Sequence, residues 1–319
     1  PERVMDSGVV SVAAGGKHTI FAKSDGSLWA MGDNSNGQFG TGDTSNPKSP
    51  VEVIPSGVAA ANPSEFAYVL KNDGALLYHG RVVPATRPEE YLPSGVLQVA
   101  NPYLKLVYLK DNGSLWRLKY HPRIDEELVS SGVAVVAGPN GWPGGHALFI
   151  KENGSLWGFG ANQNGQLGDG TTTARDDPFQ IVVSEVVTAA ASGYHSLFIK
   201  TDGSLWAMGL NNYGQLGDGT TVDRYSPVKV VDDGVIAVAA GSGHTLFLKE
   251  DGSLWAMGWN HRGQLGDGTT QSQHLPVKVV DDGVVAMAAG YGSSGQVESL
   301  MVKTDGSLWS VGSNEYGQL

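Results

Sequence analysis

The chain contains 319 residues with a net charge of −11, and it has no cysteine. The absence of cysteine excludes disulfides, zinc–thiolate sites and cysteine nucleophiles. The acidic balance disfavours nucleic acid as a partner, since a broad nucleic-acid footprint needs a basic face. No apolar run approaches the roughly 18 residues of a membrane-spanning helix, so membrane insertion is not expected.

The first predicted element is a strand formed by the four opening residues. Pro1-Glu2-Arg3-Val4 matches Pro227-Val228-Lys229-Val230 and Pro276-Val277-Lys278-Val279, which open the fourth strand of two later units. The chain ends at Leu319, before a fourth strand of its last unit. We therefore expect the N-terminal strand to complete the last sheet, which closes the array and hides both of its edges.

A motif close to Asp-Gly-Ser-Leu-Trp follows seven times along the chain. Its copies begin at Asp25, Asp73, Asn112, Asn153, Asp202, Asp251 and Asp305. Consecutive copies lie 39 to 54 residues apart, which is the period of the blades of a β-propeller. Five units follow the pattern well, whereas units two and three, in residues 58–133, are degenerate.

Each unit is predicted to contain four short strands. In residues 235–281, a small, apolar run at 235–240 precedes a β-rich run at 244–249, an Asp-Gly hairpin turn, a third strand at 253–258 and a fourth at 276–280. No segment has the period or the length of a helix. The sequence thus predicts an all-β fold, with residues 1–319 forming a single domain. This domain is a seven-bladed β-propeller with four-stranded blades, and the N-terminal strand closes its ring.

The predicted strand order places the connections on two faces. Connections between strands two and three and between successive units are short and nearly alike, and we call their face the uniform face. Connections one-to-two and three-to-four share the other face, which we call the variable face. There, the stretch from the Gly ending strand three to the Pro opening strand four covers 18 steps in four units but 8 in unit two. This difference predicts a notch over units two and three.

Aromatic, histidine and arginine residues outside the repeat pattern gather in the variable-face loops. Aromatic residues and arginine are enriched in the hot spots of binding interfaces. The sequence therefore predicts a binding surface formed by Trp142, Tyr194, Asn211, Tyr213, Trp259, His261, Arg262 and Tyr291, joined on the short-loop side by His79, Tyr120 and Arg123.

Other recurring residues are interpreted as structural. His18, His146, His195 and His244 share one repeat position on different blades, so they do not converge on one metal ion, and we expect them to be buried and to bond the blade backbone. The Gly-Asp-Gly-Thr-Thr loops lack the alternating acidic ligands of a calcium site and are interpreted as turns. The repeat tryptophans are interpreted as core anchors. We therefore predict no catalytic residue, no metal site and no cofactor.

The pattern Gly-x-x-His-Thr-Leu, then Asp-Gly-Ser-Leu-Trp-Ala-Met-Gly, then Gly-Gln-Leu-Gly resembles the regulator-of-chromosome-condensation repeat of bacterial type over the whole chain. The resemblance implies a propeller, but it does not fix a function, because the family includes exchange factors, photoreceptors and inhibitors. The acidic charge argues against the chromatin docking of an exchange factor. The presence of only two tryptophans outside the repeat, Trp142 and Trp259, argues against photoreception.

The leading hypothesis is a rigid, non-catalytic module that binds a protein or a large ligand through the variable face. A monomer is favoured, as is an extracellular or bacterial cell-surface location over a cytoplasmic one.

Three alternatives remain. The first is a carbohydrate-active enzyme or glycan-binding propeller that uses the notch as its cleft, with Glu298, Glu315 and the acidic cluster at 125–127 as its weak carboxylate options. The second is an inhibitor of a secreted enzyme such as a β-lactamase. The segments Ser131-Gly132-Val133 and Ser7-Gly8-Val9-Val10 resemble the repeats of that inhibitor branch of the family. The third is a structural module of a longer surface protein.

Overall fold

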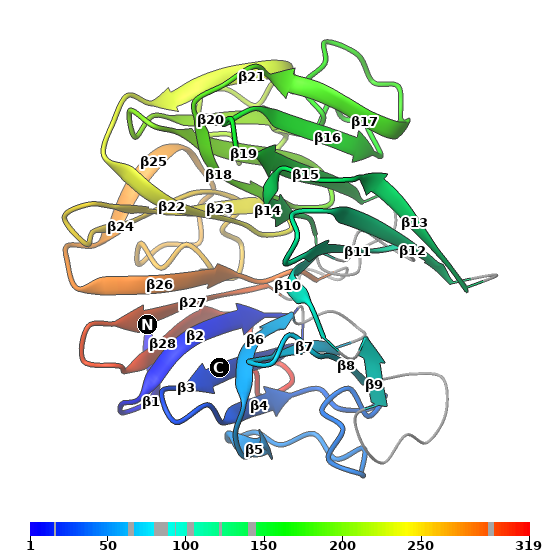
Figure 1. Cartoon of the computed structure of the whole chain (residues 1–319). Coiled ribbons are helices and arrows are strands. Elements are labelled where there is room, and N and C mark those ends of the chain that lie inside the picture. Colours follow the sequence, from blue (N-terminus) through cyan, green and yellow to red (C-terminus); the bar gives the residue numbers. More distant parts are fainter. Residues whose placement is uncertain are drawn as a thin grey trace.

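The computed structural model of the chain describes residues 1–15, 17–62, 67–79, 89–92, 94–100, 105–120, 123–139, 145–292 and 297–319. The side chains of residues 60–62, 67, 68, 78, 79, 89–91, 105, 119, 120, 123 and 124 are not described. The described elements are 28 strands in seven four-stranded antiparallel sheets (Figure 1). No described element is a helix, and no described segment could therefore cross a bilayer as one. The sheets are the blades of a seven-bladed β-propeller, which confirms the predicted fold class.

The first three blades use their strands in chain order. Blade 1 contains β2 (Val9–Ala14), β3 (His18–Lys23), β4 (Leu28–Gly32) and β5 (Val51–Ile54). Blade 2 contains β6 (Val58–Asn62), β7 (Ala67–Lys71), β8 (Leu76–His79) and β9 (Glu89–Leu92). Blade 3 contains β10 (Val96–Ala100), β11 (Lys105–Lys110), β12 (Leu115–Tyr120) and β13 (Arg123–Val129).

The remaining blades repeat this order, apart from the last strand of blade 7. Blade 4 contains β14 (Val133–Ala137), β15 (His146–Lys151), β16 (Leu156–Gly160) and β17 (Arg175–Val182). Blade 5 contains β18 (Val186–Ala191), β19 (His195–Lys200), β20 (Leu205–Gly209) and β21 (Arg224–Val231). Blade 6 contains β22 (Val235–Ala240), β23 (His244–Lys249), β24 (Leu254–Gly258) and β25 (Gln273–Val280). Blade 7 contains β26 (Val284–Ala289), β27 (Glu298–Lys303), β28 (Leu308–Gly312) and β1 (Glu2–Met5).

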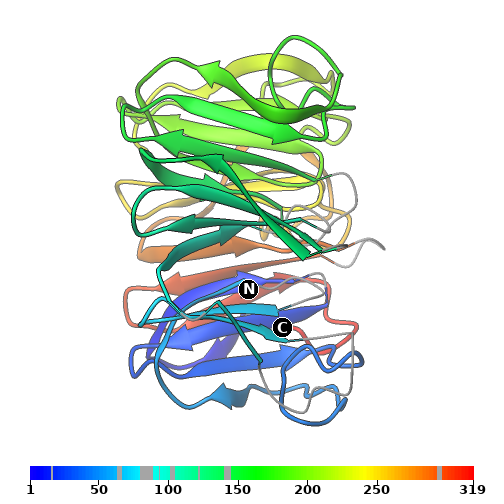
Figure 2. The same cartoon turned by 45° about the vertical axis from the view of Figure 1, so that its right-hand side comes forward.

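The N-terminal strand closes the ring, as the sequence predicts. β1 pairs antiparallel with β28, with Glu2 opposite Ser310 and Arg3 opposite Trp309. The backbone N–H of Val9 in blade 1 donates a 3.0 Å hydrogen bond to the carbonyl of Gly306 in blade 7. Figures 1 and 2 show the red strands of blade 7 beside the blue strands of blade 1, although they come from opposite ends of the chain.

The hydrophobic core lies between the blades rather than within one of them. Each of seven clusters of buried residues joins two neighbouring blades. Between blades 5 and 6, for example, Leu197 and Ile199 pack with Phe247 and Met257. First strands of neighbouring blades also contact each other, so the first strand of each blade is the innermost one. This shared core is why a repeat that cannot bury its own faces folds as a ring.

The Asp-Gly-Ser-Leu-Trp motif forms the turn between the second and third strands. In blade 6, Asp251 Oδ1 accepts hydrogen bonds from the backbone N–H and the hydroxyl of Ser253, and that hydroxyl accepts a 2.9 Å bond from Trp255 Nε1. Gly252 has a φ of 77°, and a side chain there would meet the backbone of Gly283. The turn is therefore fixed by its own residues and by the next inter-blade turn, which explains its uniformity.

The six repeat tryptophans pack against the inter-blade cores, as predicted, and each is half-buried. Trp255 packs against the core between blades 5 and 6, stacks on Phe247 at 6.0 Å between ring centroids, and carries Lys249 Nζ 5.6 Å from its centroid.

The repeat histidines join neighbouring blades. His195 Nε2 of blade 5 lies 3.0 Å from the hydroxyl of Thr245 in blade 6, which donates in turn to the carbonyl of Gln215 in blade 5. His146 and His244 make the same kind of contact with Ser196 and Ser299. The expected backbone bond is therefore indirect, because a hydroxyl of the next blade lies between the imidazole and the carbonyl.

Blade 7 has a glutamate where the other regular blades have a histidine. The Glu298 side chain is fully buried, and burial raises the pKa of its carboxyl well above the usual value. The hydroxyl of Thr19, in the next blade, donates to the carbonyl of Gln318 at 2.7 Å. Among the described residues neither carboxyl oxygen of Glu298 has a hydrogen-bond partner. A carboxylic acid thus occupies the buried position that holds a neutral imidazole in the other regular blades.

We expect Glu298→Gln to stabilise the protein increasingly as pH rises above 4.5. The folded state keeps the Glu298 proton while the unfolded state releases it, so wild type loses about 1.4 kcal/mol of stability for each pH unit over which this holds. Urea unfolding at pH 5 and pH 8 checks the prediction, with Glu298→His as a second variant that restores the repeat residue. A stability difference that does not change with pH contradicts it.

Candidate functional site

Three aromatic side chains from two blades meet on the variable face. Tyr213 lies in the β20–β21 loop of blade 5, and Trp259 and His261 lie in the β24–β25 loop of blade 6. The Tyr213 and Trp259 rings stack with centroids 5.6 Å apart, and His261 meets them edge-on at 6.4 and 5.9 Å. We call these three residues the aromatic cluster. The structure thus brings together three residues that the sequence predicts separately.

The aromatic cluster is partly open to solvent. Tyr213 is 37% exposed, His261 is exposed and Trp259 is half-buried. The Trp259 Nε1 atom is buried and has no hydrogen-bond partner among the described residues. Gly243 lies beneath the pair, and a Cβ added there would lie 3.4 Å from both Tyr213 and Trp259. Blades 1 and 5 have Lys17 and Tyr194 at this repeat position, whereas blade 4 also has a glycine, Gly145. At Gly243, the absence of a side chain leaves room for the stacked rings.

The loops that carry the cluster are held by buried asparagines. Asn211 donates to Asp218 Oδ1 at 3.0 Å and to the carbonyls of Thr220 and Val222, while its own Oδ1 accepts from Leu216 N. Asn260 does the same in the next loop. We place Asn211, a predicted member of the surface, inside the fold, because its side chain is fully buried and bonded to its own loop.

The Gly-Asp-Gly-Thr-Thr segments complete these loops as turns. Asp169 Oδ1 accepts from the backbone N–H and the hydroxyl of Thr171, and its other oxygen lies 2.6 Å from Arg175 Nε. Burial acts to raise the pKa of Asp169, but hydrogen bonds from Thr171, Arg175 and Asn162 lower it to about 2. The carboxylate of Asp169 is therefore bonded within its own loop, as expected for a turn.

An ion pair extends the surface toward blade 7. Arg262 lies 3.3 Å from Glu315 of the last loop, and both side chains are about half exposed, at 48% and 47%. The sequence predicts Arg262 as a binding residue but does not reveal this partner, since 53 positions separate the two. An exposed pair of this kind contributes little to stability, so both side chains are available to rearrange on binding.

Tyr194 and Tyr291 form a second aromatic group nearer the axis. They follow the innermost strands of blades 5 and 7, and Tyr291 is largely enclosed. Burial, with Tyr194 nearby, raises the pKa of the Tyr291 hydroxyl, which also faces the backbone of Gly193. Ser242 Oγ accepts a 2.9 Å bond from Gly292 N, so this group is linked to the cluster through the Ser242-Gly243 loop. Contacts between neighbouring loops therefore run from blade 5 to blade 7.

The remaining predicted residues cannot be placed as side chains. Trp142 lies outside the described residues. His79, Tyr120 and Arg123 belong to β8, β12 and β13, whose backbones are described there without their side chains. Tyr120 pairs with Arg123 across a two-residue connection, which is the short loop predicted for blade 3. The loop at 80–88, on which the other half of the predicted notch depends, is outside the described part of the chain.

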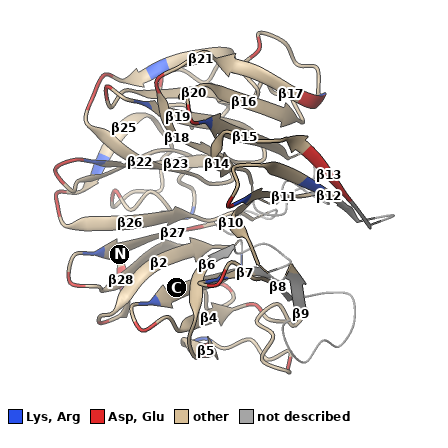
Figure 3. Ribbon diagram, viewed as in Figure 1, with Lys and Arg blue, Asp and Glu red and all other residues tan. Residues whose placement is uncertain are grey.

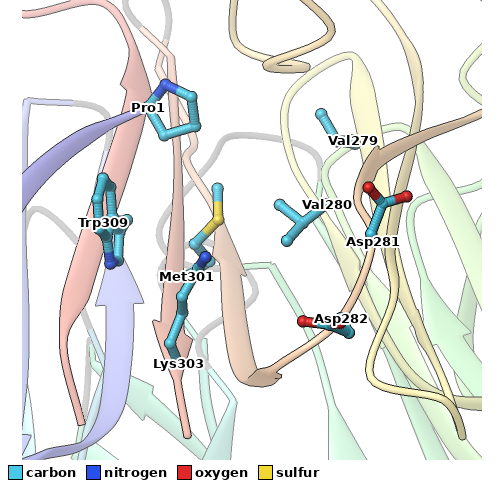
Figure 4. A pocket seen from close by; sticks show the side chains of 8 residues that line it. All are labelled: Pro1, Val279, Val280, Asp281, Asp282, Met301, Lys303 and Trp309. Atoms are coloured by element: carbon cyan, nitrogen blue, oxygen red, sulfur yellow. The ribbon is translucent and has the colours of Figure 1, made fainter. Parts of the chain in front are cut away.

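Most of the carboxylates considered for catalysis are buried or paired, whereas Glu127 is exposed. Glu298 is fully enclosed and does not reach the surface. In β13, the outer strand of blade 3, Glu126 pairs with Arg117 at 2.7 Å and Asp125 accepts a 3.0 Å bond from Tyr108. Glu315 is paired with Arg262. A cavity of about 430 Å³ lies at the uniform side of blades 6 and 7, away from these groups and from the aromatic cluster (Figure 4).

The chain resembles several solved propellers. Prp20p from Saccharomyces cerevisiae matches with a TM-score of 0.78 at 16% identity, over 97% of this chain and 84% of that one. Human WBSCR16 matches with a TM-score of 0.79 at 21% identity, over 94% and 88%. Yeast RCC1 (Prp20) bound to Kap60 matches with a TM-score of 0.77 at 17% identity, over 97% and 82%. At these identities the likeness establishes the fold.

Sequence models of the regulator of chromosome condensation (RCC1) repeat match the chain in several blades. One matches residues 25–62, 153–199, 202–248 and 251–295, and a second matches residues 9–38, 186–215 and 235–264. The matched segments leave out residues 63–152, which contain most of the two degenerate units. Because the first model alone covers more than half of the chain, the protein belongs to the regulator of chromosome condensation (RCC1) repeat family.

Proposed function

We propose that this propeller is a non-catalytic module that binds a partner protein through the variable face of blades 5 to 7. The observation that carries the proposal is the aromatic cluster, in which Tyr213, Trp259 and His261 from two blades meet at a partly open surface. Partly exposed aromatic residues beside an arginine are the usual composition of an interface hot spot.

The rigidity of the loops supports a binding role. Buried Asn211 and Asn260 hold the two loops in one shape, so docking costs little ordering entropy. Propellers of the same fold bind proteins: Prp20p is described with its binding to Gsp1p and histones, and yeast RCC1 with Kap60. Those partners belong to those proteins, and what carries over to this chain is the class of partner, a protein.

Loss of the aromatic cluster should weaken partner binding by more than about 1 kcal/mol for each residue, which is at least fivefold in Kd. The variants are Tyr213→Ala and Trp259→Ala, and the partner is one recovered by pull-down with the wild-type protein and then titrated calorimetrically. Tyr225→Ala is the matched control, because Tyr225 is 46% exposed on β21 and does not belong to the cluster. Equal affinity of all three variants, each with wild-type thermal unfolding, contradicts the proposal.

A further inference from the structure

The first strand of every blade carries a β-bulge at its second residue. In blade 6, Val235 pairs with Lys249 and Ala237 pairs with Leu248, so Ile236 is left without a pairing residue. The same shift occurs in the other six blades. The seven bulged residues are Val10, Ala59, Leu97, Ala134, Val187, Ile236 and Val285, which we call the bulge ring.

Every residue of the bulge ring is apolar and exposed. The five large members are 49% to 57% exposed, whereas the valine that precedes each of the seven is at most 5% exposed. The bulge therefore turns one apolar side chain per blade out of the inter-blade core. Because first strands are innermost and begin directly after the short inter-blade turns, the seven side chains surround the axis at the uniform face.

Acidic side chains border the bulge ring. Asp233 and Asp282 are exposed and stand three residues before Ile236 and Val285. Glu152 and Glu250 are exposed too, and their backbone N–H groups donate to the carbonyls of Gly132 and Gly234, which directly precede the first strands of the same two blades. The red segments in the turns at the left of Figure 3 mark this face.

The lysines of the same turns point away from the axis. Lys151 and Lys249 lie over Trp157 and Trp255 of the third strands, with Nζ 4.5 and 5.6 Å from the ring centroids. Lys200 does the same over its own tryptophan and also pairs with Glu185 at 3.5 Å. The centre of the uniform face therefore combines apolar side chains with negative charge, while its positive charge lies farther out.

The cavity beside blade 7 combines apolar and charged side chains. One side is lined by Pro1, Met301, Lys303 and Trp309, and the other by Val279, Val280, Asp281 and Asp282 (Figure 4). Lys303 follows the pattern of the other lysines, with its Nζ 5.4 Å from the ring centroid of Trp309. Asp282 belongs to the turn that leads into Val285 of the bulge ring. The acidic side of this cavity therefore lies next in the chain to one member of the bulge ring.

We propose that the bulge ring binds a basic segment of a partner protein, one that presents apolar side chains between lysines or arginines. An exposed apolar patch at one end of a folded domain is typical of an interaction site, and the surrounding carboxylates select a cationic partner. Two copies of this face would bring like charges together, and an anionic lipid surface would be repelled in the same way. This surface is separate from the variable face and is independent of the function proposed above.

A labelled peptide of sequence Lys-Lys-Leu-Phe-Leu-Lys-Lys is the probe, with fluorescence anisotropy as the measurement. The ring variant is Val187→Ser/Ile236→Ser/Val285→Ser. The control is Val222→Ser/Tyr225→Ser/Leu275→Ser, which removes apolar side chains of similar exposure elsewhere. We expect the ring variant to bind at least tenfold more weakly than wild type, and the control to change by less than twofold. Equal binding by the ring variant and the control overturns the proposal.

A second variant tests the charge and does not alter the ring. Asp233→Asn/Asp282→Asn should weaken peptide binding at least threefold and should reduce its dependence on salt; an unchanged salt dependence overturns the proposal. Sedimentation velocity of the wild-type protein and the ring variant tests whether a second copy of this chain binds the bulge ring instead. A wild-type dimer that the ring variant abolishes would show that a second copy, rather than a basic segment, occupies the ring, and this too overturns the proposal.

Discussion

Lowering the pH from 7 toward 4 should destabilise the propeller steeply, well before its surface carboxylates are protonated. Burial lowers the pKa of the repeat histidines from 6.5 to about 4 for His18 and His244, and to about 3 for His146 and His195. In that range the unfolded state binds protons that the folded state does not. The stability present above pH 6.5 is therefore lost as pH falls toward 4, by up to about 5 kcal/mol per pH unit for the four histidines. Protonated Glu298 acts in the opposite direction by about 1.4 kcal/mol per pH unit above pH 4.5, so the net loss is up to about 4 kcal/mol per pH unit.

Urea unfolding at pH 7, 6 and 5 measures this slope, and a histidine variant assigns it. His195→Gln keeps a polar side chain opposite Thr245 but does not titrate, so it should reduce the slope by about 1.4 kcal/mol per pH unit. His274→Gln is the control, because His274 is exposed on β25 and should leave the slope unchanged. A free energy of unfolding that is flat between pH 7 and 5 would show that the histidines are not buried as neutral rings.

The repeat pattern predicts those parts of the fold that depend on local chemistry. The Asp-Gly turn and the bond from Ser253 to Trp255 are complete within five residues, so seven copies reveal seven blades. Strand boundaries are less accessible: the fourth strand of blade 6 begins at Gln273, three residues before the predicted start, because a bulge lets Gly258 pair with Gln273. Such a shift depends on the neighbouring strand, so the sequence of the fourth strand alone does not reveal it.

The site is less predictable than the fold, because its contacts cross from one repeat to the next. Tyr213 and Trp259 are 46 positions apart, and only the docking of blade 5 on blade 6 brings them together. Asn211 resembles an exposed loop residue in sequence, yet its amide bonds four groups of its own loop. The exposure of the bulge residue Ile236 likewise cannot be predicted from the sequence, because Ile236 stands in an apolar run beside the buried Val235.

Removing residues 1–8 should be among the most damaging changes to this protein. The deletion removes β1, whose Val4 and Met5 pack against the core between blades 7 and 1. Two half-buried apolar side chains contribute roughly 1–1.5 kcal/mol each, and the lost strand-pairing bonds about 0.5–1.5 kcal/mol each, so we expect a loss of about 3–5 kcal/mol. The control is Asp6→Ala, which breaks only the exposed ion pair with Arg3 and should cost less than about 1 kcal/mol.

The deletion should also change how the protein associates. Without β1, the backbone groups of β28 form an unpaired strand edge, and the half-buried Trp309 beside it gains exposure. Exposed edges of this kind pair with other chains, so sedimentation velocity should show concentration-dependent association in the truncated protein and none added in Asp6→Ala. A truncated protein that keeps wild-type stability and sedimentation would mean that the ring does not depend on its first strand. The inter-blade cores alone would then hold blades 7 and 1 together.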